Sequence, residues 1–184
     1  MDIKIVKCTP DKLKAKPADE SKLGFGKIFT DHMFTVKYQD GKGWHDPVIG
    51  PYAPIVLDPT AMSLHYGQEI FEGLKAYRGR NGDIYLFRPM ENIKRMNASA
   101  ERLCMATIDP DLFMEGMKQL VLLEQDWIPR GEGTSLYIRP TMIATEPALG
   151  VHPADQYLFF IIVGPVGAYY PEGFSPTKIY VSEY

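Results

Sequence analysis

Three polar side chains, Tyr137, Arg139 and Thr141, alternate with apolar residues along the segment 134–145. In a β-strand, this two-residue period places the three on one face and their apolar neighbours on the other. An arginine beside a tyrosine in an apolar strand needs a polar partner, because burying an unpaired charge is costly. A ligand, an exposed face and an internal salt bridge each satisfy that need, and the pattern leaves all three open.

The segment 75–102 is basic, with seven Lys or Arg residues against three acidic residues. Arg95 falls in the first two turns of a helix that we expect to begin at Pro89. Free amides and the helix dipole at a helix start favour an anion, and an arginine adds a bidentate donor fork. Arg95 is therefore a candidate phosphate ligand, with a solvated basic face as the alternative.

Two irregular segments complete the set of candidate site residues. Residues 63–73 combine a histidine, two other aromatic residues and two glycines without clean periodicity, as pocket linings often do, although a turn in the core has the same composition. Residues 166–173 have the composition of a loop that connects two units. Nucleotide-binding glycine motifs, a Gly-x-Ser-x-Gly elbow and metal-ligand spacings are all missing from the sequence, so we expect no metal site.

The composition narrows the class of protein. The chain has 184 residues, 45% of them hydrophobic and 23% charged, as in a globular domain. A formal net charge of −3 argues against a nucleic-acid partner. The only cysteines, Cys8 and Cys104, indicate a reducing compartment. Because no apolar run suits a signal peptide or a membrane span, we expect a cytoplasmic protein without a membrane partner.

The strands that position these residues follow from local patterns. Residues 157–163 are apolar on both faces and should be central in the sheet. Residues 48–57 form an edge strand at best, because two prolines interrupt them. An Asn-Gly pair between residues 74–78 and 83–87 predicts a β-hairpin. The remaining strands are expected at 33–38, 134–145 and, near the end of the chain, 178–181.

Two helices are expected between these strands. The first begins at Pro89, and the second begins at Pro110, with Asp109 as its N-cap, and should end by Pro129. Their apolar stripes are Ile93, Met96, Ala100, Leu103 and Cys104 in the first, and Leu112, Phe113, Met117, Leu120, Val121 and Glu124 in the second. Hairpins and clustered helices without β-α-β alternation predict an α+β fold with a largely antiparallel sheet.

Three strings go beyond these general patterns: SLHYGQEIFEGLKAY at 63–77, LFRPMENIKRM at 86–96 and GTSLYIRP at 133–140. In this order they closely resemble branched-chain amino acid aminotransferases, which belong to fold-type IV of the pyridoxal-phosphate enzymes. The string FTDHM at 29–33 resembles the longer, eukaryote-like subgroup. The resemblance runs from about residue 25 to the end of the chain.

The resemblance implies roles for individual residues. Arg95 matches the arginine that holds the phosphate of pyridoxal 5'-phosphate, and Tyr137 and Arg139 match residues on the substrate-carboxylate side of the pocket. The apolar walls for the branched side chain match Phe25, Phe71 and Tyr169. A third group matches residues that each subunit contributes to its partner's active site, which implies a homodimer: Tyr66, Leu149 and Val151.

The resemblance also divides the chain into an arm (1–24), the smaller N-terminal domain (25–168), an interdomain loop (169–176) and the start of a truncated second domain (177–184). The family's Schiff-base lysine would lie beyond Tyr184, so no catalytic residue is expected here. We therefore expect the parent enzyme to transfer an amino group between Leu, Ile or Val and 2-oxoglutarate. The chain alone should be inactive and bind the cofactor weakly or not at all.

Two alternatives stay open at this stage. A D-amino acid aminotransferase or an aminodeoxychorismate lyase would share the fold, with different pocket strings. A folded dimerisation or binding module without catalysis would suit the isolated chain, because an apolar face exposed by a missing domain favours association.

Overall fold

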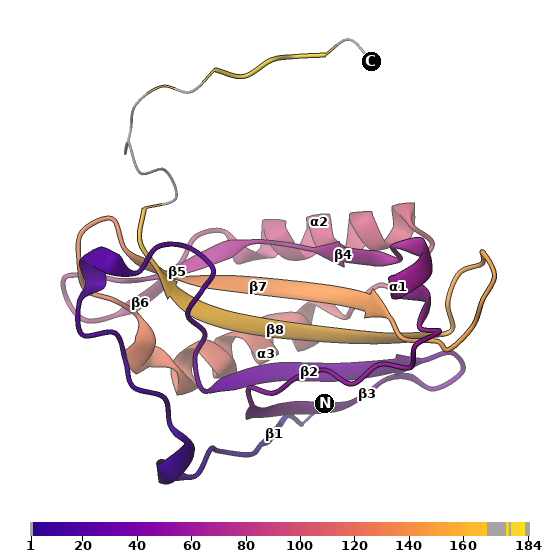
Figure 1. The fold of residues 1–184 in the computed structure, drawn as a ribbon, viewed down its shortest axis with the longest axis horizontal. Coiled ribbons are helices and arrows are strands. Elements are labelled where there is room, and N and C mark those ends of the chain that lie inside the picture. Colours follow the sequence, from indigo (N-terminus) through magenta and orange to yellow (C-terminus); the bar gives the residue numbers. More distant parts are fainter. Residues whose placement is uncertain (1, 169–175, 177, 183–184) are drawn as a thin grey trace.

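The computed structural model of the chain describes residues 2–168, 176 and 178–182. Its centre is an eight-stranded sheet in the order β1-β3-β2-β8-β7-β5-β6, with β4 paired to β7 beside this path (Figure 1). Every strand pair described is antiparallel except β1 with β3. The strands are β1 Lys4–Ile5, β2 His32–Gln39, β3 Gly43–Pro51, β4 Glu69–Phe71, β5 Leu74–Arg78, β6 Ile84–Leu86, β7 Ser135–Ala144 and β8 Gln156–Val166.

The helices are α1 Met62–Tyr66, α2 Pro89–Arg102 and α3 Pro110–Leu123, with short 3-10 turns at Pro10–Lys12, Glu20–Lys22 and Gln125–Trp127. The two long helices, α2 and α3, lie on the same side of the sheet (Figure 1). The prediction of an α+β fold with a largely antiparallel sheet and two main helices is therefore confirmed. None of the helices in the described part of the chain has the length and apolarity needed to cross a bilayer.

The long pair β7–β8 forms the middle of the sheet. β8 pairs with β2 on one side and β7 on the other, which confirms its predicted central position. Along β7, Leu136, Ile138 and Met142 are fully buried, whereas Tyr137 and Arg139 are only half-buried on the opposite face. The predicted alternation is thus present, and it separates an apolar core face from a polar face.

Strand β3 differs from the prediction for residues 48–57. It lies between β1 and β2, so it is not an edge strand, and residues 52–57 form no strand. The arm supplies the missing neighbour, because Lys4 and Ile5 of β1 pair with Val48 and Ile49. Pro51 is the last residue of β3, and the backbone N–H of the next residue, Tyr52, still donates to the carbonyl of Asp31 (2.8 Å).

The predicted stripe of α2 is wrong at its end. Leu103 is 44% exposed, and Cys104 is exposed with a φ of 55°. The N–H of Cys104 donates to the carbonyl of Glu101 (3.1 Å), and that of Met105 donates to Ala100 (2.8 Å). This is a Schellman C-cap, which turns the chain so that Met105 is buried instead.

Helix α3 begins as predicted and ends earlier. The Asp109 carboxylate accepts from the N–H of Asp111 (2.8 Å), which confirms the cap. The helix stops at Leu123, well before Pro129, and the buried Glu124 lies just beyond it.

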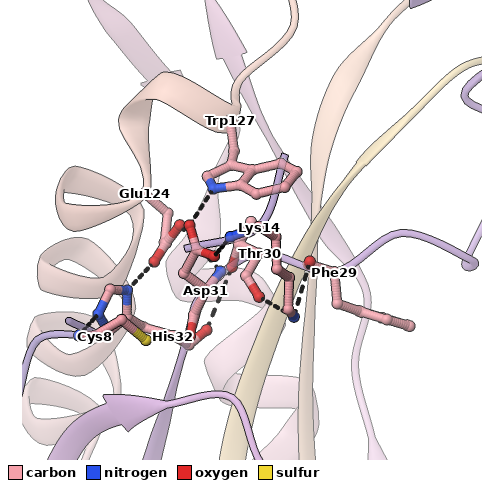
Figure 2. A network of polar contacts seen from close by, with 8 residues as sticks. All are labelled: Cys8, Lys14, Phe29, Thr30, Asp31, His32, Glu124 and Trp127. Carbon is pink, nitrogen blue, oxygen red and sulfur yellow. Dashed lines mark hydrogen bonds and ion pairs between the residues drawn. The ribbon is translucent and has the colours of Figure 1, made fainter. Parts of the chain in front are cut away.

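The two ends of the chain behave differently. Residues 178–182 are exposed and form no strand, contrary to the prediction for 178–181, because no described strand pairs with them. The predicted loop at 169–176 lies outside the described residues except for residue 176. The arm, in contrast, packs on the sheet (Figure 2). The N–H of Cys8 donates to Nε2 of the buried His32 (2.8 Å), and the N–H of Lys14 donates to the buried Asp31 (2.8 Å).

Candidate functional site

Tyr137 is the centre of the polar face of β7. Its hydroxyl accepts hydrogen bonds from Nε (3.1 Å) and Nη2 (2.8 Å) of Arg139. The ring of Phe25 meets the tyrosine ring edge-on, with centroids 4.9 Å apart. The guanidinium carbon of Arg139 lies 4.3 Å from the centroid of the Phe71 ring. The four side chains therefore form one aromatic and cationic cluster, drawn from the loop before β2, β4 and β7.

A cavity of about 240 Å³ opens beside this cluster, and most of its lining is apolar. Gly164 in β8 has no side chain to keep the neighbouring segment away, because a Cβ there would lie 2.1 Å from the carbonyl oxygen of Ile28. The segment that follows Phe25 can therefore run directly along β8. The lining residues are Phe25, Gly26, Ile28, Phe29, Tyr137, Arg139, Ile162, Gly164 and Val166.

Arg95 projects from the second turn of α2 and forms a bidentate ion pair with Glu72. Its Nε and Nη2 donate to the two carboxylate oxygens at 2.9 Å each. The Glu72 side chain is only 13% exposed, whereas that of Arg95 is 61% exposed. Nδ2 of the buried Asn92, one turn earlier on α2, donates to the same carboxylate (2.8 Å).

Two opposing effects act on the Glu72 carboxyl. Burial, the larger single contribution, opposes ionisation, but the hydrogen bonds from Arg95 and Asn92 and the charge of Arg95 together hold the pKa of Glu72 below its usual value. The same pair raises the pKa of Arg95. Both groups are therefore charged at neutral pH.

A second cavity, of about 490 Å³, lies where Arg95 reaches the surface. Its charged lining residues are Lys75, Arg88, Arg95 and one acid, Glu91. This excess of cations suits an anionic group. Tyr137 lines both cavities, so the cationic and apolar spaces share one wall.

The chain is similar to two bacterial proteins over most of its length. It is 54% identical to branched-chain-amino-acid transaminase 1 of Bacillus subtilis over 171 residues. These residues make up 92% of this chain and 48% of that protein. A probable branched-chain-amino-acid aminotransferase of Streptomyces coelicolor is 53% identical over 161 residues, 87% of this chain and 44% of that protein. Over most of its length, this chain is a homologue of branched-chain aminotransferases. It spans about half the length of these curated relatives.

Solved structures support the same fold. The Escherichia coli branched-chain aminotransferase aligns with a TM-score of 0.54 at 21% identity, over 74% of this chain and 40% of that one. The T.th. branched-chain aminotransferase, solved with pyridoxamine 5'-phosphate, aligns with a TM-score of 0.53 at 27% identity, over 74% and 41%. The fold is thus that of the N-terminal domain of fold-type IV aminotransferases, as predicted. No protein-family model matches the chain.

The aminotransferase resemblance named nine site residues, and the structure sorts eight of them into two places. Phe25, Phe71, Tyr137, Arg139 and Arg95 lie in or beside the two cavities. The second place lies at the other end of β7, where the hydroxyl of Tyr66 accepts from the N–H of Gly150 (2.7 Å), between the exposed Leu149 and Val151. Tyr169 lies outside the described residues.

Sequence reasoning assigned no role to Glu72 or Asn92, although both fall within the strings that carry the resemblance. Asn92 lies three residues before Arg95 on the same predicted helix, a spacing that could have identified it, whereas Glu72 lies 23 residues from Arg95 and has no such signal. Among the residues that the structure describes, no group of three or more His, Cys, Asp or Glu side chains is placed to hold a metal ion.

Proposed function

We propose that this chain provides part of the cofactor and substrate site of a branched-chain amino acid transaminase. The observation that carries the proposal is the shared wall at Tyr137, which joins a cationic cavity at Arg95 to an apolar cavity at Phe25. The one suits a phosphate, and the other suits a branched aliphatic side chain. Relatives with 53–54% identity bear the same activity in their names.

The residues of the cationic cavity fit pyridoxal 5'-phosphate. Arg95 would hold its phosphate, with Lys75 and Arg88 adding positive charge. When bound, the cofactor supplies the electron sink for amino-group transfer. The chain's own residues bind and orient, and we propose that the lysine that carries the cofactor belongs to a segment outside this sequence.

The substrate would lie against β7. Arg139 is held by the Tyr137 hydroxyl and by stacking on Phe71, so its remaining N–H donors can pair with a substrate carboxylate. Phe25 supplies an apolar wall and excludes water, and Tyr169 is proposed to add to it. An apolar wall with one charged anchor favours Leu, Ile and Val, and 2-oxoglutarate would present its own carboxylate to the same arginine.

We further propose a homodimer in which Tyr66, Leu149 and Val151 serve the partner's site. Leu149 and Val151 are 68% and 87% exposed, which suits residues that become buried on association. The proposed division is an arm (1–24), a small domain (25–168), a connecting loop (169–176) and the start of a second domain (177–184). The cysteine content favours a reducing compartment such as the cytoplasm.

A chimera tests the proposal. The 171 matched residues of the Bacillus subtilis relative are replaced by those of this chain, and transamination of leucine with 2-oxoglutarate is measured. We expect activity, and we expect Arg139→Ala to lower kcat/KM about ten- to hundredfold, as for loss of a charge-assisted hydrogen bond. A folded, cofactor-loaded chimera without activity would contradict the proposal, as would activity confined to D-alanine or aminodeoxychorismate.

A further inference from the structure

We infer that Glu72 is a positioning residue that fixes Arg95 so that the outer edge of its guanidinium group faces the cationic cavity and receives an anionic phosphate. The inference rests on the proposed function, because it takes Arg95 as the phosphate anchor. It adds a residue to which the resemblance assigned no role.

The hydrogen bonds of Arg95 divide its guanidinium group into two edges. A guanidinium has five N–H donors, and Glu72 takes one from Nε and one from Nη2. The donors on Nη1 and the second donor on Nη2 lie away from that edge. One edge of the guanidinium group therefore binds Glu72, and the other edge can donate two parallel hydrogen bonds to two oxygens of a phosphate.

Glu72 is itself fixed from two elements. Asn92 donates to its carboxylate (2.8 Å) and also to the carbonyl of Gly73 (3.2 Å). The backbone N–H of Glu72 donates to the carbonyl of Pro140 in β7 (3.0 Å). The carboxylate thus links α2 to the segment between β4 and β5. Because Arg95 donates two hydrogen bonds to this carboxylate, the position of its guanidinium group is fixed as well.

Glu72 acts through Arg95, because Arg95 lines the 490 Å³ cavity and Glu72 does not. Long arginine side chains lose much rotamer freedom when they bind a ligand. A carboxylate that already holds the guanidinium removes most of that cost before the anion arrives.

Charge and positioning predict opposite effects when Glu72 is neutralised. Loss of a negative charge near the cavity should strengthen anion binding if only the field matters. Loss of the two hydrogen bonds to Arg95 should weaken anion binding if positioning matters. Glu91 provides the matched control, because it lines the same cavity and pairs with Lys94 (3.1 Å) rather than with Arg95.

The experiment titrates the 184-residue chain with inorganic phosphate and follows the Nε–Hε signal of Arg95 by ¹H–¹⁵N NMR. We expect Glu72→Gln to raise the Kd roughly two- to tenfold, which is the cost of immobilising one long side chain. Glu91→Gln should lower the Kd or leave it unchanged. In an Arg95→Lys background, which lacks the guanidinium group and is followed through the backbone ¹H–¹⁵N signal of Asn92 instead, Glu72→Gln should no longer weaken binding.

Two results have different meanings. If the wild type binds phosphate at Arg95 and Glu72→Gln binds as tightly as Glu91→Gln or more tightly, the positioning role is overturned while the proposed function stands. If phosphate leaves the Arg95 signal of the wild type unmoved, Arg95 does not bind phosphate in this chain and the positioning role is overturned, whereas the proposed function is decided separately by the activity of the chimera.

Discussion

Replacing Glu124 tests the buried polar network that joins the arm to the end of α3 (Figure 2). Nε2 of His32 accepts the N–H of Cys8 (2.8 Å), so it carries no proton. A neutral imidazole then has its proton on Nδ1, which faces the Glu124 carboxylate. The side chains of His32 and Glu124 are only 6% and 2% exposed, so water cannot replace either partner.

The expected magnitude follows from what each substitution leaves unpaired. Glu124→Ala leaves the Nδ1–H of His32 without an acceptor and opens a buried cavity. Together these effects should lower the free energy of unfolding by about 2–4 kcal/mol. Glu124→Gln keeps an acceptor oxygen facing His32 and should cost less than about 1 kcal/mol. Glu115→Ala, on the exposed face of α3, is the control and should stay within about 0.5 kcal/mol.

Urea unfolding followed by far-UV circular dichroism measures all three variants. The pH dependence gives a second reading, because burial above all raises the pKa of Glu124. A raised carboxyl pKa penalises the folded state above that pKa, and the penalty is relieved as the pH falls towards the ordinary value of 4.5. The wild type should therefore gain stability relative to Glu124→Gln on mild acidification. An alanine variant as stable as wild type would refute the assigned hydrogen bonds.

Two further substitutions or labels probe other contacts. Gly164→Ala places a Cβ 2.1 Å from a backbone oxygen and should lower stability by about 1–3 kcal/mol in thermal unfolding. Gly50→Ala, where the nearest atom to the new Cβ is a side-chain carbon at 3.6 Å, should lower stability less. Equal losses of stability in the two variants would contradict the close approach at Gly164. Cys104 should react faster with a thiol reagent than Cys8, because burial first and nearby acids second raise the pKa of the Cys8 thiol, and equal rates would argue against the docked arm.

Local patterns predicted the elements because their signals lie within a few residues. The two-residue alternation of β7, the Asn-Gly hairpin turn and the Asp109 cap all act over short distances, and all are present. The predictions of elements were wrong where a neighbouring strand or a helix cap determined the local structure. The arm turned β3 from an edge strand into an internal one, and the left-handed Cys104 ended a stripe that sequence spacing had extended.

The candidate site shows the same division. Tyr137 and Arg139 were identified from spacing, because one strand presents both. The Glu72–Arg95 pair joins positions 23 residues apart, and the His32–Glu124 pair joins positions 92 apart. Neither pair has a periodic signal in one sequence, since each forms only when the helices dock on the sheet.

The distance between the two groups of site residues supports the proposed dimer. Tyr137 lies near the start of β7, and the strand ends seven positions later at Ala144, which at about 3.4 Å per residue is roughly 24 Å away. The loop with Leu149 and Val151 follows that far end and is tied there by Tyr66. Within one subunit, Leu149 and Val151 therefore follow the end of β7 opposite to Tyr137. This placement supports the proposal that these residues serve the substrate site of a second copy.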